Sequence, residues 1–232
     1  LEVINLVRSL KIDIAIDLSG YTGGNNRSIF ANRVAPIQIS YLGFPGTTAL
    51  QNMDYIIADE TIIPKKKIKY YSEKVIYLPN CYQANMNQRE ISDKNLSRDQ
   101  FGLPKDSFIY CCFNNSYKIT PHIFSSWLKI LNEVENSVLW ILKTNDVAAD
   151  NLKKEAKKAG VDPKRVIFAE KLTNKEHLKR ISLADLFLDT FPYNAHTTAS
   201  DTVRMGVPII TLIGNSFSSR VAASILKNLN MN

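Results

Sequence analysis

The amino-acid sequence predicts an α/β fold with parallel β-sheets. In the second half of the chain, apolar runs of strand length alternate with segments of helical periodicity, and the connections between them are short. The helix boundaries carry characteristic residues: Pro121 falls in a first helical turn, and Gly160 and Gly206 each follow a helix. Such alternation is typical of β-α-β units, in which a helix connects two parallel strands.

The elements of the second half follow one another in regular order. Strands are predicted at 108–113, 138–142, 166–169, 186–188 and 208–212. Helices are predicted at 121–134, 150–159, 174–182, 197–205 and 216–229. This half therefore reads as a nearly whole Rossmann-like unit, in which ligands bind at the carboxyl ends of the strands.

The first half is similar but less complete. A helix at 4–10 is followed by predicted strands at 14–18, 37–42, 55–58 and 75–78. Residues 83–99 are polar with little apolar periodicity, which indicates an interdomain linker. We expect a first lobe over 1–90, incomplete at its N-terminus, and a second lobe over 96–232 that lacks its closing helices.

The composition is that of a globular protein: 45% of the 232 residues are hydrophobic and 22% are charged. This excludes a disordered chain, and no apolar run is long enough to span a bilayer. The net charge of 29 − 22 = +7 suits an acidic ligand such as a nucleotide phosphate or nucleic acid, although a solvated surface explains most individual lysines. Cys81, Cys111 and Cys112 form neither a disulfide framework nor a zinc motif, so we expect a reducing, cytoplasmic setting.

Two polar segments follow predicted strands and offer groups for a nucleotide. Residues 114–118 combine amides with Lys118, which suits a phosphate, or they only cap the next helix. Residues 170–180 include His177 and Arg180, which are three residues apart and share a helix face. That face is suited to a base, and an exposed polar helix is the alternative.

A third segment, 189–201, combines a helix start with hydroxyl, imidazole and carboxylate groups. A helix beginning near Thr197 offers unpaired backbone N–H groups and the positive end of its dipole. The hydroxyls of Thr197 and Thr198, with His196, add donors for a diphosphate, and Asp201 lies one turn further, where it can accept ribose hydroxyls. In the alternative, a threonine caps the helix and His196 is structural.

Several signatures of other nucleotide sites and of hydrolases are missing from the sequence. It contains no Walker A motif, no Gly-x-Gly-x-x-Gly after a strand and no Gly-x-Ser-x-Gly. It also contains no Asp-x-Asp, which argues against a glycosyltransferase that binds its diphosphate through a metal. We therefore expect no metal site.

Short motifs along essentially the whole chain match one family in order. They include Tyr-Leu-Gly-Phe-Pro-Gly-Thr at 41–47, His-Thr-Thr at 196–198 and Ser-Arg-Val-Ala-Ala-Ser at 219–224. Further matches lie at 20–22, 35–38, 53–57, 71–74, 101–104, 113–119 and 137–140. Together they resemble the catalytic region of the O-linked N-acetylglucosamine transferases, glycosyltransferase family 41, which includes many bacterial homologues with tetratricopeptide repeats.

This resemblance implies a GT-B fold of two Rossmann-like lobes with the donor between them, and an inverting, metal-independent enzyme without a cofactor. Lys118 looks like the lysine that neutralises the donor diphosphate, and 196–198 looks like the pyrophosphate-binding turn. Asp201 resembles the ribose-binding acid, while His177 and Arg180 resemble the pair that faces uracil. The UDP-binding candidates are Asn115, Lys118, His177, Arg180, His196, Thr197, Thr198 and Asp201, with Lys118 and His196 as catalytic candidates.

The same resemblance places Leu42, Gly43 and Pro45 in the loop that lines the sugar pocket. Tyr193 stands where the animal enzymes have a small cysteine beside the N-acyl group, so a tyrosine there narrows the pocket. Asn115 stands where those enzymes have Gln. The tyrosine bears on the identity of the sugar more than on UDP, whereas Asn115, Asn174 and Tyr193 together leave a non-catalytic module open.

Three hypotheses follow for the function. The first is transfer of a sugar, N-acetylglucosamine foremost, from UDP to protein Ser/Thr; the second is a relative that uses UDP-glucose or a GDP-sugar; the third is a non-catalytic nucleotide-binding or scaffold module. The expected partners are a UDP-sugar and an acceptor protein, with neither nucleic acid nor a membrane, and a repeat domain in the full-length parent. Because the first lobe begins partway through its fold, we expect the isolated chain to be inactive in transfer.

Overall fold

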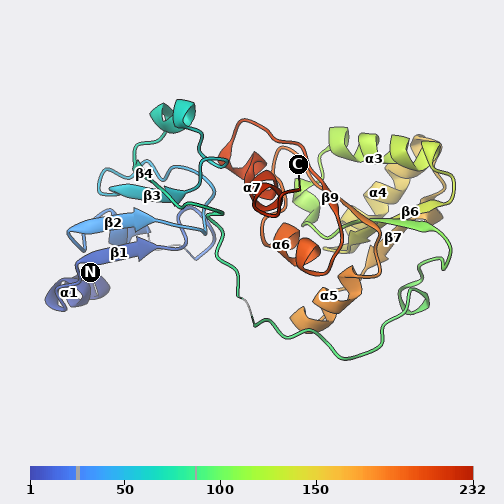
Figure 1. Cartoon of the computed structure of the whole chain (residues 1–232), viewed down its shortest axis with the longest axis horizontal. Helices are drawn as coiled ribbons and strands as arrows, with labels where there is room; N and C mark the ends of the chain where they lie inside the picture. The colour runs from blue at the N-terminus through green and yellow to red at the C-terminus, as the bar shows by residue number, and fades with distance from the viewer. Residues whose placement is uncertain (25–26, 87, 232) are drawn as a thin grey trace. The chain divides into compact units, whose positions relative to one another are not determined.

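The computed structural model of the chain describes residues 1–24, 27–86 and 88–231 (Figure 1). It divides into two compact units, Leu1–Asn85 with Asn215–Asn232, and Met86–Gly214. Each unit is built on a sheet whose paired strands are all parallel. The predicted α/β class with two parallel sheets is therefore confirmed.

The first unit carries its strands in chain order across the sheet, β1-β2-β3-β4. Its elements up to residue 85 are α1 (Glu2–Ser9), β1 (Ile14–Asp17), α2 (Arg27–Phe30), β2 (Ile37–Ser40), β3 (Tyr55–Ala58), η1 (Lys65–Tyr70) and β4 (Lys74–Tyr77). The four strands begin within a residue of the predicted positions, because each is a short, mainly apolar run, although Ile14 and Ile16 of β1 remain about half exposed.

The last segment of the chain packs with the first unit. It forms η5 (Phe217–Ser219) and α7 (Val221–Asn228) in place of the single predicted helix at 216–229. The Ser224 hydroxyl donates to the buried Asp59 carboxylate at 2.6 Å, and Arg220 Nε donates to the Thr61 carbonyl at 2.6 Å. These bonds fix α7 on the first unit, so the second compact unit, 86–214, differs at both ends from the expected lobe of 96–232.

The second unit has the strand order β7-β6-β5-β8-β9. Its strands are β5 (Phe108–Cys112), β6 (Ser137–Leu142), β7 (Val166–Ala169), β8 (Leu186–Leu188) and β9 (Ile209–Ile210). Its helices are η2 (Asp99–Phe101), η3 (Ser116–Lys118), α3 (Pro121–Glu133), α4 (Asp146–Lys158), η4 (Pro163–Arg165), α5 (Asn174–Ile181) and α6 (Thr197–Arg204). Helix α4 begins earlier than the predicted residue 150, because the Asn145 side chain accepts a hydrogen bond from the Ala148 N–H at 2.8 Å and caps it.

This strand order creates a topological switch point. The chain starts at β5, adds β6 and β7 on one side, and then adds β8 and β9 on the other. The strands β5 and β8 are neighbours, but the connection after β5 leads to one side of the sheet and the connection after β8 leads to the other. Ligands of such sheets bind at the carboxyl ends of these two strands. The core beneath is apolar, with Trp140 and Phe187 fully buried.

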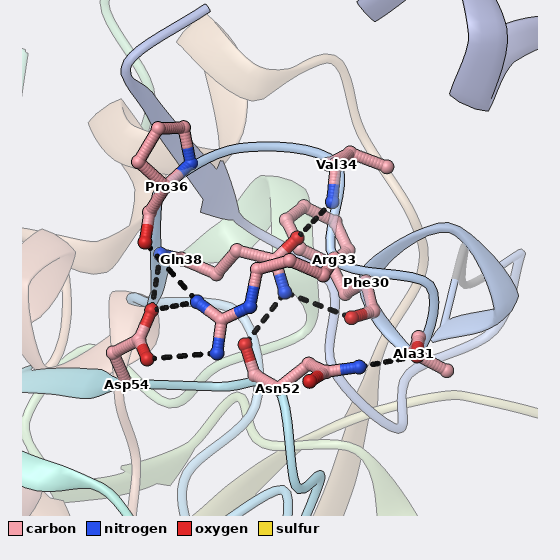
Figure 2. Close-up of polar contacts among 8 residues, drawn as sticks. All are labelled: Phe30, Ala31, Arg33, Val34, Pro36, Gln38, Asn52 and Asp54. Atoms are coloured by element: carbon pink, nitrogen blue, oxygen red, sulfur yellow. Dashed lines mark hydrogen bonds and ion pairs between the residues drawn. The ribbon is translucent and has the colours of Figure 1, made fainter. Parts of the chain in front are cut away.

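A buried polar network braces the amino-terminal edge of the first sheet (Figure 2). The fully buried Gln38 accepts a bond from the Val34 N–H at 2.9 Å and donates to the Asn52 carbonyl at 2.6 Å. Beside it, the Arg33 guanidinium donates to both carboxylate oxygens of Asp54, at 2.5 and 2.9 Å. These hydrogen bonds lower the pKa of that carboxyl. Two of the family motifs, 35–38 and 53–57, therefore stabilise the fold at this edge, because β2 and β3 begin there.

Candidate active site

Lys118 joins the two loops of the switch point. Its Nζ donates to the Asn194 carbonyl at 3.0 Å and lies 3.9 Å from the centre of the Tyr193 ring. Burial lowers the pKa of Lys118 below that of a solvated lysine, and the nearby Asp189 carboxylate opposes that shift. The fold thus brings the predicted phosphate lysine against the turn that leads to His196.

The Asp189 carboxylate holds that turn in place through hydrogen bonds. The carboxylate is buried and accepts hydrogen bonds from the backbone N–H groups of Thr190 and Ala195, both at 2.7 Å, and from the Thr211 hydroxyl at 2.6 Å. Burial raises the pKa of Asp189 to about 6 in spite of these bonds. The sequence reasoning missed this residue, although its position directly after an apolar strand was a usable signal.

The turn ends at the start of α6. The carbonyl of His196 accepts from the N–H groups of Ala199 and Ser200, at 3.0 and 3.2 Å, so His196 is the N-cap residue. The first N–H groups of a helix, here those of Thr197 and Thr198, have no intrahelical acceptor and lie at the positive end of its dipole. This is the arrangement of donors that the sequence predicted for a diphosphate.

Asn115 has a structural task within this arrangement. Its exposed side chain accepts a hydrogen bond from the Tyr117 N–H at 3.4 Å and caps the 3₁₀ turn that carries Lys118. The next helix, α3, is capped by Thr120 and not by residues 114–118, while Lys118 turns toward Asn194.

His177 and Arg180 contact each other, as their spacing predicted. Arg180 Nε donates to His177 Nδ1 at 3.0 Å, and another guanidinium nitrogen donates to the Glu170 carbonyl. Arg180 is only 1% exposed, so it lies beneath His177 instead of beside it on an open face. Among the described residues its Nη2 has no hydrogen-bond partner, and burial lowers its pKa to about 10.

Burial of His177 determines its charge, and its bond with Arg180 determines its tautomer. Burial, together with the positive charges of Arg180 and Arg89, lowers the pKa of His177 to about 4. The imidazole is therefore neutral at pH 7. Since Nδ1 accepts from Arg180, the proton resides on Nε2, which is left as a donor.

Asp201 is buried on α6 and forms an ion pair with Arg89. Burial raises the pKa of Asp201, whereas the charge and hydrogen bond of Arg89 lower it. Arg89 lies in the segment that the sequence assigned to a linker, and no motif or periodicity there singled it out.

The predicted sugar-pocket residues Leu42, Gly43 and Pro45 lie in the first unit, in the loop after β2. Leu42 adopts a left-handed backbone with φ of 68°, and a Cβ on Gly43 would stand 1.9 Å from the Leu18 carbonyl oxygen. The buried Glu73 carboxylate accepts from the Thr48 hydroxyl and N–H at 2.6 and 2.7 Å. Tight packing and this carboxylate therefore fix the loop, while the fourth predicted residue, Tyr193, belongs to the second unit.

In residues 1–24, 27–86 and 88–231, no group of three or more histidine, cysteine, aspartate or glutamate side chains is placed to hold a metal ion. Across the same described ranges, no helix is long and apolar enough to cross a membrane.

Comparison with protein families assigns the chain to one family. Residues 3–94 and 85–232 match the model of glycosyl transferase family 41. The chain belongs to this family. The match covers both units, so the chain corresponds to the catalytic region of an O-GlcNAc transferase-type enzyme with a GT-B-like fold.

Individual members and solved structures agree with this assignment. The chain is 41% identical over 228 residues to the probable UDP-N-acetylglucosamine–peptide N-acetylglucosaminyltransferase SEC of Arabidopsis thaliana, covering 96% of this chain and 23% of that protein. A mutant O-GlcNAc transferase of Thermobaculum terrenum superimposes with a TM-score of 0.88 at 27% identity, over 99% of this chain and 44% of that one. HepE of Anabaena, solved with UDP, shares the fold at 13% identity and a TM-score of 0.62, over 99% and 71% of the two chains.

The chain spans about a quarter of the length of the curated family 41 relatives that it matches.

Proposed function

We propose that this family 41 chain binds a UDP-sugar through its second unit and, within its full-length protein, transfers the sugar to Ser/Thr hydroxyls of an acceptor protein with inversion. N-acetylglucosamine is the first candidate sugar, as in the names of its relatives SEC and the Thermobaculum terrenum enzyme. No metal or cofactor is required in this proposal.

The contact between Lys118 and the Asn194 carbonyl is the observation that carries the proposal. It holds an ammonium group at the carboxyl ends of β5 and β8, next to the turn that starts α6. A diphosphate bound there meets a lysine of reduced hydration and the first N–H groups of a helix.

This arrangement suits departure of a nucleoside diphosphate. As the bond between the anomeric carbon and the β-phosphate oxygen breaks, negative charge grows on that phosphate. Lys118, the N–H groups of Thr197 and Thr198, and the donors of His196 supply fixed positive charge and hydrogen bonds. A metal ion is not needed for that balance.

The nucleoside end is proposed to lie toward α5 and Asp201. Neutral His177 presents an Nε2–H donor, and Arg180 holds the ring from beneath at 3.0 Å. Asp201 offers a carboxylate to ribose hydroxyls from one turn inside α6. This set suits a uridine nucleotide, with Asn115 maintaining the turn of Lys118.

One observation favours a second candidate, a different sugar on UDP. The Tyr193 ring lies 3.9 Å from Lys118 Nζ and 5.0 Å from the His196 ring, so a bulky side chain stands beside the proposed diphosphate. Such a ring leaves less room for an acyl substituent, which favours UDP-glucose over UDP-N-acetylglucosamine.

Transfer by the full-length protein tests both candidates. It should be assayed with extract proteins and labelled UDP-N-acetylglucosamine, UDP-glucose and a GDP-sugar, beside a Lys118→Ala variant that is expected to lose transfer. Label from UDP-N-acetylglucosamine supports the first candidate, and label from UDP-glucose supports the second. Label from the GDP-sugar alone, or no transfer with any donor while nucleotide still binds, would contradict the proposal.

A further inference from the structure

The segment that links the strands of the two sheets is attached to the second unit along its length. We call residues 88–98 the strap. The Ser92 N–H donates to the Lys175 carbonyl on α5 at 3.1 Å, and Lys94 pairs with Glu176 at 2.5 Å. At its end, Arg98 forms two bonds of 3.0 and 2.9 Å to the Asp185 carboxylate. The strap therefore lies against α5 and is not a free linker.

Arg89 connects the strap to Asp201, at the proposed nucleoside end of the site. One of its guanidinium nitrogens bonds to Oδ1 of Asp201, and its charge is close enough to lower the pKa of His177. The Asp201 side chain is 10% exposed and that of Arg89 is 25% exposed, so the pair is largely shielded from water. A partly buried charge pair of this kind is held more firmly than a surface pair.

We infer that Arg89 is a positioning residue for nucleotide recognition: it holds one oxygen of Asp201, so that the carboxylate stays in place to accept a ribose hydroxyl with the other. This rests on the proposed function, because it requires Asp201 to contact ribose. Arg89 itself contacts no part of the reacting sugar in this inference, and its effect passes through Asp201.

The charges around Asp201 give the inference a pH signature. Two charged groups act on it: Arg89 from the strap and Arg204 from its own helix. Burial raises the pKa of Asp201, and Arg89 opposes that rise. Loss of Arg89 therefore raises the pKa further, so that Asp201 is protonated at a higher pH and becomes a poorer acceptor.

Calorimetric titration with two nucleotides distinguishes an effect of Arg89 on ribose recognition from an effect on the whole nucleotide. The full-length protein and its Arg89→Gln variant should be titrated with UDP and with 2′,3′-dideoxyuridine 5′-diphosphate, which has no ribose hydroxyls. Arg89→Gln is expected to weaken UDP binding roughly 10-fold, as for loss of a charge-assisted bond, but to change binding of the dideoxy analogue by less than about twofold. Arg89→Lys should restore most of the UDP affinity, because an ammonium also pairs with Asp201.

Two further measurements complete the test. As the pH is lowered, UDP affinity should begin to fall at a higher pH in Arg89→Gln than in the wild type or Arg89→Lys. In an Asp201→Asn background, Arg89→Gln should cause no further loss, since the two residues act as one unit. Lys94→Gln is the matched control: it removes one positive charge and one tether from the same strap and should leave UDP affinity unchanged.

The outcomes distinguish the inference from the function beneath it. Equal loss for UDP and the dideoxy analogue would overturn the inference, because Arg89 would then act on the diphosphate or on the fold. So would unchanged UDP binding in Arg89→Gln while the wild type still discriminates the two nucleotides. Failure of the wild type to bind UDP would overturn the proposed nucleotide site and the inference with it. A wild type that binds UDP without discriminating the two nucleotides would overturn the ribose contact of Asp201, and so the inference, but not the nucleotide site.

Discussion

Replacement of Lys118 by alanine is expected to weaken UDP binding by about 1.5–3 kcal/mol, the usual contribution of a hydrogen bond to a charged group. The structure supports the upper part of this range. Lys118 is held at 3.0 Å from the Asn194 carbonyl and packed against the Tyr193 ring, so little side-chain freedom remains to be lost on binding. Its lowered pKa also indicates incomplete hydration, so its desolvation on binding a diphosphate costs less.

Calorimetric titration of the wild type and Lys118→Ala with UDP measures this directly, and the expected loss corresponds to roughly 10- to 150-fold in Kd. Lys171→Ala is a suitable control, because Lys171 is exposed in the same unit and its loss changes the net charge equally. A Kd for Lys118→Ala equal to that of the wild type would remove Lys118 from the site. A weakened Kd that is the same in Lys118→Ala and Lys171→Ala would reduce its role to long-range attraction.

Three other perturbations test different parts of the structure. EDTA should leave UDP affinity unchanged in calorimetry, and recovery by added magnesium after a loss would refute the charge balance proposed for the diphosphate. Gln38→Ala should lower the free energy of unfolding by about 2–4 kcal/mol in urea denaturation, because it leaves buried backbone groups without partners. Replacement of the exposed Gln51 by alanine is the control and should have little effect. Equal effects of the two substitutions would mean that the network in Figure 2 contributes nothing to stability. The pKa of His177 is about 4 in the folded chain against about 6.5 unfolded, so its stabilising effect is complete above pH 6.5 and is lost as the pH falls toward 4. Wild type should lose roughly 2 kcal/mol across that interval that His177→Gln does not lose, and identical pH slopes in urea would contradict the burial of this ring.

The local arrangement of this protein could be predicted from its sequence. The strands of the second sheet follow from continuous apolar runs, which a sheet covered on both faces needs, and the helices follow from apolar residues at helical spacing. The spacing of His177 and Arg180 placed them on one face, and the two threonines after His196 indicated a helix start. Each of these predictions depends on interactions between residues close in the chain.

Tertiary structure alone decided which distant segments meet. Packing of the elements brought Lys118 to the Asn194 carbonyl across 76 positions of the chain and joined Arg89 to Asp201 across 112 positions. The same packing left Arg180 only 1% exposed. It also returned the last helix to the first unit through Ser224. No local pattern specifies such contacts, because each depends on how whole elements pack, and packing decides which side chains share a buried volume and which charges must be paired there.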